Sequence, residues 1–332
     1  MAVMENDKLN MVSGAIPDEK DERDYNFEAL GTRPLTDEEW KKGYDIEKVI
    51  GYKIPVKNQF NSYSCVGQAY AYYLAVLLGL SQRRYREVSA KSIYSLISLG
   101  FNRGAYLRDG AKTTKDLGAM WENLLKSYRN GTTDEAWMID KSWFNEDIKE
   151  IMALLKSSDY YRVTGFSMDD FARAIRDGYG MVSGVTGNNN GTWTSKEPKP
   201  PTTSTHQNWG HAMFFGKFGV DNKGKYIETL NSWGNIGDKG WQKLREDWFT
   251  KEGLWTFTPW ILITNIKTMN ETAKVLKDAN SSAVGIWMPA ISESVLKSYC
   301  LNMGIDVPIV HTNNGLTEIN WNELIDGTIN FK

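Results

Sequence analysis

Residues 58–69 read NQFNSYSCVGQA and join a polar, turn-prone run to a long apolar one. From Cys65 to Leu78 the chain has no proline, and its apolar residues recur at helical spacing, which predicts a buried helix. Ser64 is the predicted N-cap of this helix and Gly79 its predicted end. A thiol in the first turn of a helix feels the positive end of the backbone dipole, which favours the thiolate. Cys65 is therefore a candidate nucleophile.

Cys65 alone does not establish a reactive site, because free cysteine is among the most buried residue types and usually acts as a small hydrophobe. Two residues far downstream strengthen the argument. His211 opens a strand-like segment, and Asn231 closes the next one. Cysteine, histidine and asparagine can serve as a nucleophile, its base and the residue that orients the base. We therefore predict that these three side chains meet.

The sequence around these residues resembles the papain family of cysteine peptidases. The matching pieces are residues 55–59 (PVKNQ) with Ser64-Cys65, residues 210–212 (GHA), residues 231–234 (NSWG) and residues 237–241 (GDKGW). The histidine and asparagine follow the cysteine at roughly the separation of that family's layout, about 130–150 residues. The polar string from Gly14 to Tyr25 looks like the segment that precedes the domain in bacterial, archaeal and phage members, which have no long propeptide.

The resemblance implies an α+β, papain-like fold with two lobes. One lobe is helical and holds the cysteine helix, and the other is an antiparallel β lobe that holds His211 and Asn231. It also implies roles: His211 as acid and base, Asn231 as its orienter, and Gln59 as an oxyanion donor together with the Cys65 backbone N–H. Trp233 is expected to cover the contact between the histidine and the asparagine.

Other positions are less certain matches to that family. Phe60 stands where a glycine commonly follows the glutamine, Val66 where an aromatic often follows the cysteine, and Gly67 where alanine is usual. The diglycine segment of many secreted members is not recognisable. Asp109 could line the substrate channel or cap a helix, and the cap is the more frequent use. His206, in a polar loop, competes with the predicted base, and His311 is expected to be a surface residue of the tail.

Several further elements follow from periodicity and turn residues. The sequence predicts a helix over Ser89–Ile97 with Ser89 as cap, a helical run that follows residues 107–111 and ends at Leu125, and a helix over Asp169–Asp177. It predicts a buried strand over Tyr179–Val185, a long surface loop over Gly187–Gln207, and a hairpin of Gly210–Val220 with Lys225–Trp233. The hairpin would bring His211 close to Asn231.

We divide the chain into three parts. Residues 1–45 are a polar N-terminal strap, which either lies across the domain surface or occludes the cleft. Residues 46–265 are the peptidase domain. Residues 266–332 are a small helical C-terminal module, with helices expected over Glu271–Ala279, Ser292–Met303 and Asn320–Ile325, that packs on the domain or binds a protein partner.

Composition narrows the function classes. The 332 residues include 39 basic and 41 acidic ones, a formal charge of −2, which gives no reason to expect nucleic acid or a membrane as partner. Only Cys65 and Cys300 are present, so a disulfide framework is excluded and a reducing compartment is favoured. No secretory signal or membrane span is recognisable. We expect a cytoplasmic protein, or one packaged in a phage particle.

The function that these observations favour is a cysteine endopeptidase whose partner is a peptide or protein substrate. No metal or cofactor is needed for this chemistry, and no ligand spacing for one is present. Two alternatives stay open. One is a hydrolase of the same fold that cuts cell-wall peptides, and the other is a non-catalytic structural or cargo protein, for example of a phage particle.

Overall fold

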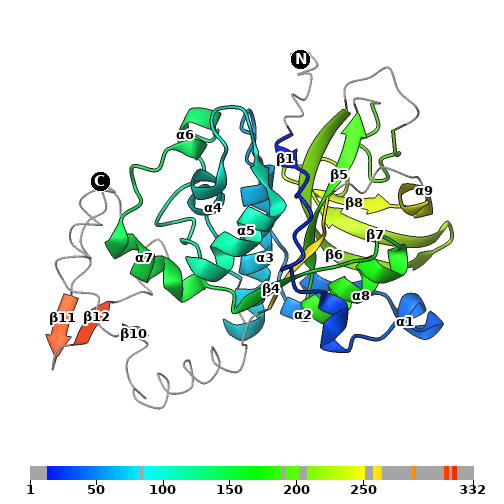
Figure 1. The fold of residues 1–332 in the computed structure, drawn as a ribbon, viewed down its shortest axis with the longest axis horizontal. Coiled ribbons are helices and arrows are strands. Elements are labelled where there is room, and N and C mark those ends of the chain that lie inside the picture. Colours follow the sequence, from blue (N-terminus) through cyan, green and yellow to red (C-terminus); the bar gives the residue numbers. More distant parts are fainter. Residues whose placement is uncertain are drawn as a thin grey trace, which may run out of the picture.

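The computed structural model describes residues 13–82, 85–188, 191–201, 208–250, 257–263, 286–288, 310–313 and 316–319. Figure 1 shows a helical lobe beside a lobe built on a twisted sheet, with the N-terminal strand β1 running between them. Within the described residues, the helices are too short or too polar to cross a membrane.

The helical lobe surrounds one buried helix. Its elements are α3 (Cys65–Gln82), α4 (Ala90–Ile97), α5 (Leu107–Asp116), α6 (Glu135–Ile139), α7 (Glu146–Met152) and η2 (Ala153–Leu155). Residues 65–79, the first fifteen of α3, are buried on every side, as the apolar run predicts. Ser89 caps α4 by accepting a hydrogen bond from Ser92 N, which confirms the predicted cap.

Two predicted helix ends are wrong. Helix α3 continues through Gly79 to Gln82, because an interior glycine costs a helix only about 1 kcal/mol and burial of the surrounding residues offsets that cost. Helix α5 ends at Asp116 rather than Leu125. Gly118 adopts a left-handed φ of +89°, and a Cβ there would lie 2.0 Å from the Met152 carbonyl oxygen, so the chain turns away at this point.

The sheet lobe contains seven antiparallel strands in the order β4-β9-β5-β6-β7-β8, with β2 paired to β6. Their bounds are β2 (Tyr44–Asp45), β4 (Asp159–Arg162), β5 (Met181–Asn188), β6 (Asn208–Asp221), β7 (Gly224–Leu230), β8 (Trp241–Leu244) and β9 (Trp260–Ile263). The predicted hairpin is confirmed, with Asp221 opposite Gly224. Its second strand ends at Leu230, immediately before Asn231.

Short helices flank the sheet. They are η1 (Phe27–Leu30), α1 (Asp37–Lys42), α2 (Ile46–Ile50), α8 (Met168–Gly178) and α9 (Glu246–Phe249). Helix α8 matches the predicted amphipathic helix, and Ser167 and Asp170 form a capping box at its start. Its Phe171 and Ile175 are buried against the sheet with Phe215.

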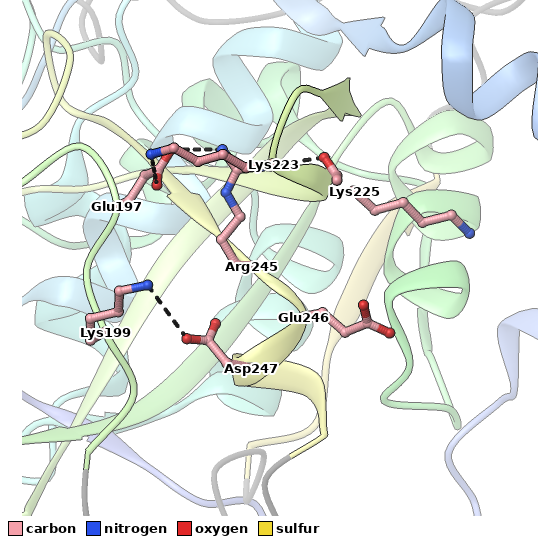
Figure 2. A pocket seen from close by; sticks show the side chains of 8 residues that line it. Glu197, Lys199, Lys223, Lys225, Arg245, Glu246 and Asp247 are labelled. Carbon is pink, nitrogen blue, oxygen red and sulfur yellow. Dashed lines mark hydrogen bonds and ion pairs between the residues drawn. The ribbon is translucent and has the colours of Figure 1, made fainter.

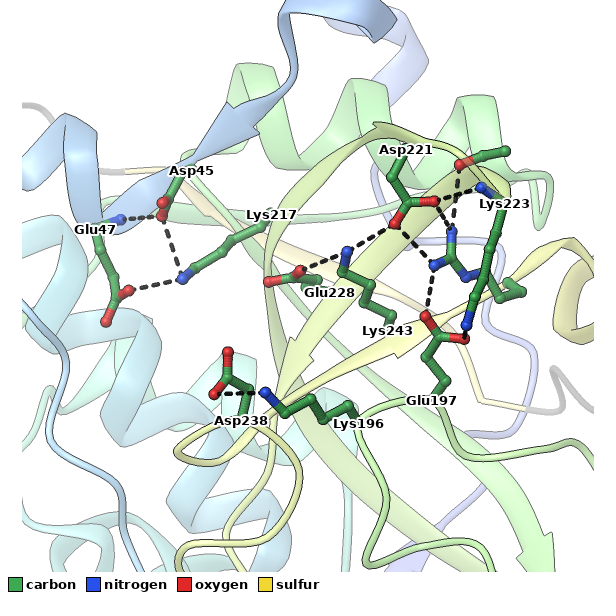
Figure 3. A network of polar contacts seen from close by, with 12 residues as sticks. Asp45, Glu47, Lys196, Glu197, Lys217, Asp221, Lys223, Glu228, Asp238 and Lys243 are labelled. Carbon is green, nitrogen blue, oxygen red and sulfur yellow. Dashed lines mark hydrogen bonds and ion pairs between the residues drawn. The ribbon is translucent and has the colours of Figure 1, made fainter.

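Charged residues tie neighbouring strands of the sheet together (Figure 3). Lys217 on β6 bonds to Glu47 at 2.7 Å and to Asp45 at 3.3 Å, which joins β2 and α2 to the sheet. Lys243 on β8 and Arg245, the residue that follows β8, both bond to Asp221. These side chains are largely shielded from solvent, with the Lys217 and Glu47 side chains only 11% and 5% exposed. Each of these cations is paired with a carboxylate, so we interpret the network as one that aligns the strands.

The N-terminal strap lies against both lobes. Its β1 (Ala15–Ile16) pairs in parallel with β3 (Ala105–Tyr106) of the helical lobe and also contacts β6 of the sheet lobe. Farther along, Trp40 of α1 is buried, and its indole nitrogen donates to Asp169 at 2.6 Å. The strap is therefore an integral part of the packing, and the division of the chain at residue 45 stays a prediction.

The described part of the C-terminal region is a small sheet. Strands β10 (Ile286–Met288), β12 (Leu316–Ile319) and β11 (Val310–Asn313) pair in that order, all antiparallel. This sheet differs from the helical module that we expected. The three predicted helices lie outside the described residues, as do Cys300 and His206.

Candidate active site

Cys65 is the first residue of α3 and is completely buried. Its sulfur accepts a hydrogen bond from the Gly14 backbone N–H of the strap at 3.3 Å. The Ala212 backbone N–H, next to His211 on β6, also bonds to the sulfur. The thiol therefore lies between the helical lobe, the strap and the strand that carries the predicted base.

The predicted base and its orienter are in direct contact. His211 Nε2 lies 2.9 Å from Asn231 Oδ1, and both residues are fully buried. The indole of Trp233 stacks on the imidazole with ring centres 4.0 Å apart and an angle of 19° between the planes. Trp233 thus covers the contact, as the sequence resemblance implies. Within the described part of the chain, His211 Nδ1 has no hydrogen-bond partner.

Burial controls the protonation of both groups. It raises the pKa of the Cys65 thiol to about 11, against the opposing effect of the Ala212 and Gly14 N–H groups. It lowers the pKa of His211 to about 3, against the opposing effect of Asn231. In this conformation the pair is a neutral thiol and a neutral imidazole. This differs from the thiolate that the helix position alone predicts, because the strap excludes water from the sulfur.

The strap runs past the thiol in a narrow space whose walls are backbone atoms. A Cβ on Gly14 would lie 2.0 Å from the Tyr63 carbonyl oxygen, and a Cβ on Gly104 would lie 1.9 Å from the Gly14 carbonyl oxygen. The Gly14 carbonyl accepts a hydrogen bond from Ala105 N at 2.8 Å. Only a glycine fits at residue 14 in this path. The strap therefore lies directly over the Cys65 sulfur, and occlusion of a substrate cleft stays a prediction.

A buried carboxylate that the sequence did not reveal anchors one wall of this space. Glu135 on α6 accepts hydrogen bonds from Tyr63 N and from the Tyr94 hydroxyl, each at 2.7 Å. Its partners lie 72 and 41 residues away, so no local pattern could identify it. Glu135 holds the backbone two residues before the thiol in place.

Gln59 lies in the loop that leads to Cys65 and is fully buried. Its Nε2 donates to the Ser62 carbonyl at 2.9 Å, and its Oε1 accepts from the Ser232 hydroxyl at 2.6 Å. Ser64 immediately precedes α3, as predicted for an N-cap, and its hydroxyl contacts Ser62 Oγ and Gln68 Nε2. These bonds join the loop before the thiol to the residue after Asn231.

Asp109 lies away from these residues. It is in the first turn of α5, but the N-cap is Tyr106 and makes no side-chain cap, so the favoured cap reading is wrong. Asp109 instead lines a cavity of about 470 Å³ between α4 and α5. His311 pairs through its backbone with Glu318 in the C-terminal sheet.

Two residues that the sequence analysis missed complete the site. Gln242 on β8 bonds to Asn231 at 2.9 Å, and Trp193, from the loop predicted to lie on the surface, is fully buried. Trp193 contacts Trp209, Trp233 and Trp248 edge to face or tilted. The sequence signal that could have identified Gln242 is a lone glutamine within a mostly buried strand. No local signal identified Trp193.

A second concave region lies on the sheet lobe, and its lining does not include Cys65, His211 or Asn231. It has a volume of about 350 Å³ and is lined by charged residues of the Glu197 loop, β7 and α9. Its cations bond to carboxylates, as Figure 2 shows for Lys223 with Glu197 and Lys199 with Asp247. It contains no predicted site residue.

The fold is that of papain-like cysteine proteases. Xylellain, a cysteine protease from Xylella fastidiosa, matches with a TM-score of 0.62 and 20% identity over 76% of this chain and 96% of that one. A ragweed pollen allergen cysteine protease in its proform matches with a TM-score of 0.53 and 19% identity over 72% of each chain. A cysteine protease from Carica candamarcensis, in complex with E-64, matches with a TM-score of 0.51 and 16% identity over 67% of this chain and 98% of that one. No family model and no curated protein matches.

Proposed function

Starting from this fold, we propose that the chain is a cysteine endopeptidase in which Cys65 is the nucleophile, His211 the acid and base, and Asn231 the orienter. The observation that carries the proposal is the enclosed His211–Asn231 pair on the strand whose Ala212 N–H contacts the thiol, with Nδ1 of the imidazole lacking a hydrogen-bond partner among the described residues. A hydrogen-bonded base held by a third group is the arrangement that activates a cysteine nucleophile.

The proposed reaction is acyl transfer. Cys65 gives its proton to His211 Nδ1, and the thiolate attacks a peptide carbonyl. His211 then protonates the leaving amine, so that the C–N bond breaks and a thioester remains. A water molecule, deprotonated by His211, hydrolyses the thioester and restores the thiol. Gln59 and the Cys65 N–H would donate to the oxyanion.

The conformation described here is a latent one in this proposal. The Gly14 N–H donates a hydrogen bond to the Cys65 sulfur, and in this proposal the strap fills the space where a peptide would bind. A thiol with a pKa near 11 is almost entirely protonated at neutral pH. Activity therefore requires the strap to leave, after which solvent and His211 can stabilise the thiolate.

The first prediction tests the thiol directly. We would measure the iodoacetamide alkylation rate of Cys65 against pH in a Cys300→Ser background. With the strap unmodified, Cys65 should be alkylated slowly. Gly14→Val, whose side chain meets the Tyr63 backbone, should release the strap and raise the rate at pH 6 by about a hundredfold, since an imidazolium partner can lower a cysteine pKa to about 3–4.

Two controls interpret this result. Glu22→Ala, at an exposed strap position, should leave the rate unchanged. Adding His211→Ala to Gly14→Val should abolish the reactivity below pH 7. If the released thiol reacts only as the pH approaches 8.5, whether or not His211 is present, the endopeptidase proposal fails and the structural or cargo role becomes the better account. Rapid alkylation with cleavage of cell-wall peptides alone would favour the wall hydrolase.

A further inference from the structure

Gln242 has a fixed orientation in the core of the sheet lobe. It lies on β8, fully buried, and its Nε2 donates to two backbone carbonyls of the neighbouring loop, Trp193 O at 2.7 Å and Ser195 O at 2.9 Å. Carbonyl oxygens only accept hydrogen bonds, so the NH₂ end of the carboxamide must face them. The Oε1 end of Gln242 therefore faces Asn231.

The orientation of Gln242 determines the orientation of the next carboxamide. Asn231 Nδ2 donates to Gln242 Oε1 at 2.9 Å, which leaves Asn231 Oδ1 to face the imidazole. Because Oδ1 can only accept, His211 Nε2 must carry the proton in the 2.9 Å contact between them. A neutral imidazole has one N–H, so Nδ1 carries the lone pair. Nδ1 is the nitrogen that a base needs for the thiol.

We propose that Gln242 is a positioning residue that sets the tautomer of His211 through Asn231. The proposal rests on the proposed peptidase function, because the tautomer matters only if His211 takes a proton from Cys65. The series of bonds begins at main-chain carbonyls, whose hydrogen-bonding role cannot change. It ends at the ring nitrogen that faces away from Asn231. The loop around Trp193 thereby becomes part of the active site.

An apolar residue at position 242 would pack as well but would leave Asn231 free to turn. Rotation of the Asn231 carboxamide by half a turn would present Nδ2 to the imidazole, and the proton would then move to Nδ1. A histidine with its proton on Nδ1 cannot accept one from the thiol. Gln242, Asn231 and His211 are all fully buried, so no water can replace the lost contacts.

The experiment reads the tautomer by NMR in the full chain labelled with ¹⁵N-histidine. The sequence has 3 histidines, so assignment is practical. Burial holds the pKa of His211 at about 3, so its ring is neutral at pH 7 and one measurement suffices. The unaltered chain should show a protonated Nε2 and an unprotonated Nδ1. A protonated Nδ1 in this chain would overturn the proposal without any variant.

The variants are Gln242→Leu and Gln242→Met, the second being unbranched and of similar length. Each should shift the tautomer ratio toward protonated Nδ1 by about ten- to a hundredfold, the effect of leaving a buried polar group unpaired. Thr229→Val is the matched control. Thr229 is opposite Gln242 on β7, is fully buried, and donates to the Phe214 carbonyl, so its loss should not move the tautomer.

Two outcomes separate this inference from the function on which it rests. A folded Gln242 variant that keeps the wild-type tautomer overturns the positioning role, whatever the alkylation rates show. The tautomer could shift as expected while the alkylation rate of the strap-released thiol shows no dependence on His211. In that case the peptidase proposal fails and the positioning role of Gln242 stands. If both hold, the Gln242 variants in the Gly14→Val background should also lose alkylation at pH 6.

Discussion

The carboxamide of Gln59 has bonded partners at both ends, so its removal has two separable effects. Nε2 donates to Ser62, and Oε1 accepts from Ser232. We predict that Gln59→Ala lowers kcat of the strap-released chain by about a hundred- to a thousandfold, the usual loss for one oxyanion donor. It should also destabilise the protein by about 1–3 kcal/mol, because Ser232 loses a buried partner. Peptide hydrolysis and thermal unfolding measure the two effects.

Ser232→Ala is the control for Gln59→Ala. It removes the same contact from the other side and leaves the Gln59 amide in the loop before Cys65. We expect a comparable loss of stability with most of the activity retained. Equal losses of activity in both variants would mean that Gln59 acts only through the fold.

Single residues also show what the sequence could and could not predict. From residue types and order, the sequence predicted the contact between His211 and Asn231 that the structure shows, and the role of Cys65 stays a prediction. The sequence marked Gly67 and Phe60 as departures without an explanation. The structure supplies one: a Cβ on Gly67 would lie 2.6 Å from Tyr94 Cβ, so α3 and α4 require a glycine there. Phe60 adopts a φ of +45°, the region that glycine favours. Such contacts depend on a residue distant in sequence.

The strap is fastened to α5 by one arginine. The Arg108 guanidinium donates to Asp24 through Nε at 3.0 Å and Nη2 at 2.6 Å, and to the Glu19 carbonyl at 2.6 Å. The Arg108 backbone N–H bonds separately to Asp18. A substitution of the side chain therefore removes the clamp on Asp24 and Glu19 and leaves the bond to Asp18.

We predict that Arg108→Ala, with the strap itself unaltered, increases the alkylation rate of Cys65 by about ten- to a hundredfold. The reason is that hydrogen bonds to charged groups contribute about 1.5–3 kcal/mol. The matched control is Arg23→Ala, which removes an exposed pair with Asp21 inside the strap. That control should leave the rate unchanged. An unchanged rate in Arg108→Ala would show that β1 and the bonds to Asp18 keep the strap closed without the Arg108 side chain.

Elements with strong local signals were predictable, and elements set by distant neighbours were not. The hairpin of β6 and β7 follows from a turn between two apolar runs, and α4 and α8 follow from periodicity with a capping residue. The ends of α3 and α5 depend on what each helix meets. The pairing of β1 with β3 joins segments ninety residues apart through two registered pairs, Ala15 with Ala105 and Ile16 with Tyr106.

Closure of the strap against both lobes buries one titrating group, Asp18. Burial raises the pKa of Asp18 to about 6, partly opposed by the Arg108 and Trp260 N–H groups and by the Arg108 charge, while Asp109 adds to the rise. Asp18 thus contributes most to closure when it is protonated, and this contribution is lost as the pH rises through 6. Cys65 and His211 together hold one proton both as the buried neutral pair and as the thiolate–imidazolium pair proposed for the open form, so they add little pH dependence between about pH 4 and 6.

Closure of the unaltered chain should therefore weaken as the pH rises from about 4 to 6. Asp18→Asn removes this contribution, so closure should be nearly independent of pH in that range. His211→Ala leaves Asp18 in place, so closure should keep the slope of the unaltered chain. Each slope is at most about tenfold per pH unit, the effect of one proton.

Hydrogen exchange at the Ala105 amide measures this closure, because that amide donates to the Gly14 carbonyl only while the strap is in place. Exchange rates corrected for the intrinsic pH dependence give the closed population without using the thiol. A slope in the unaltered chain that Asp18→Asn abolishes and His211→Ala keeps would establish that Asp18 controls closure. A slope that persists in Asp18→Asn would contradict this role and would mean that other groups of the two lobes control opening.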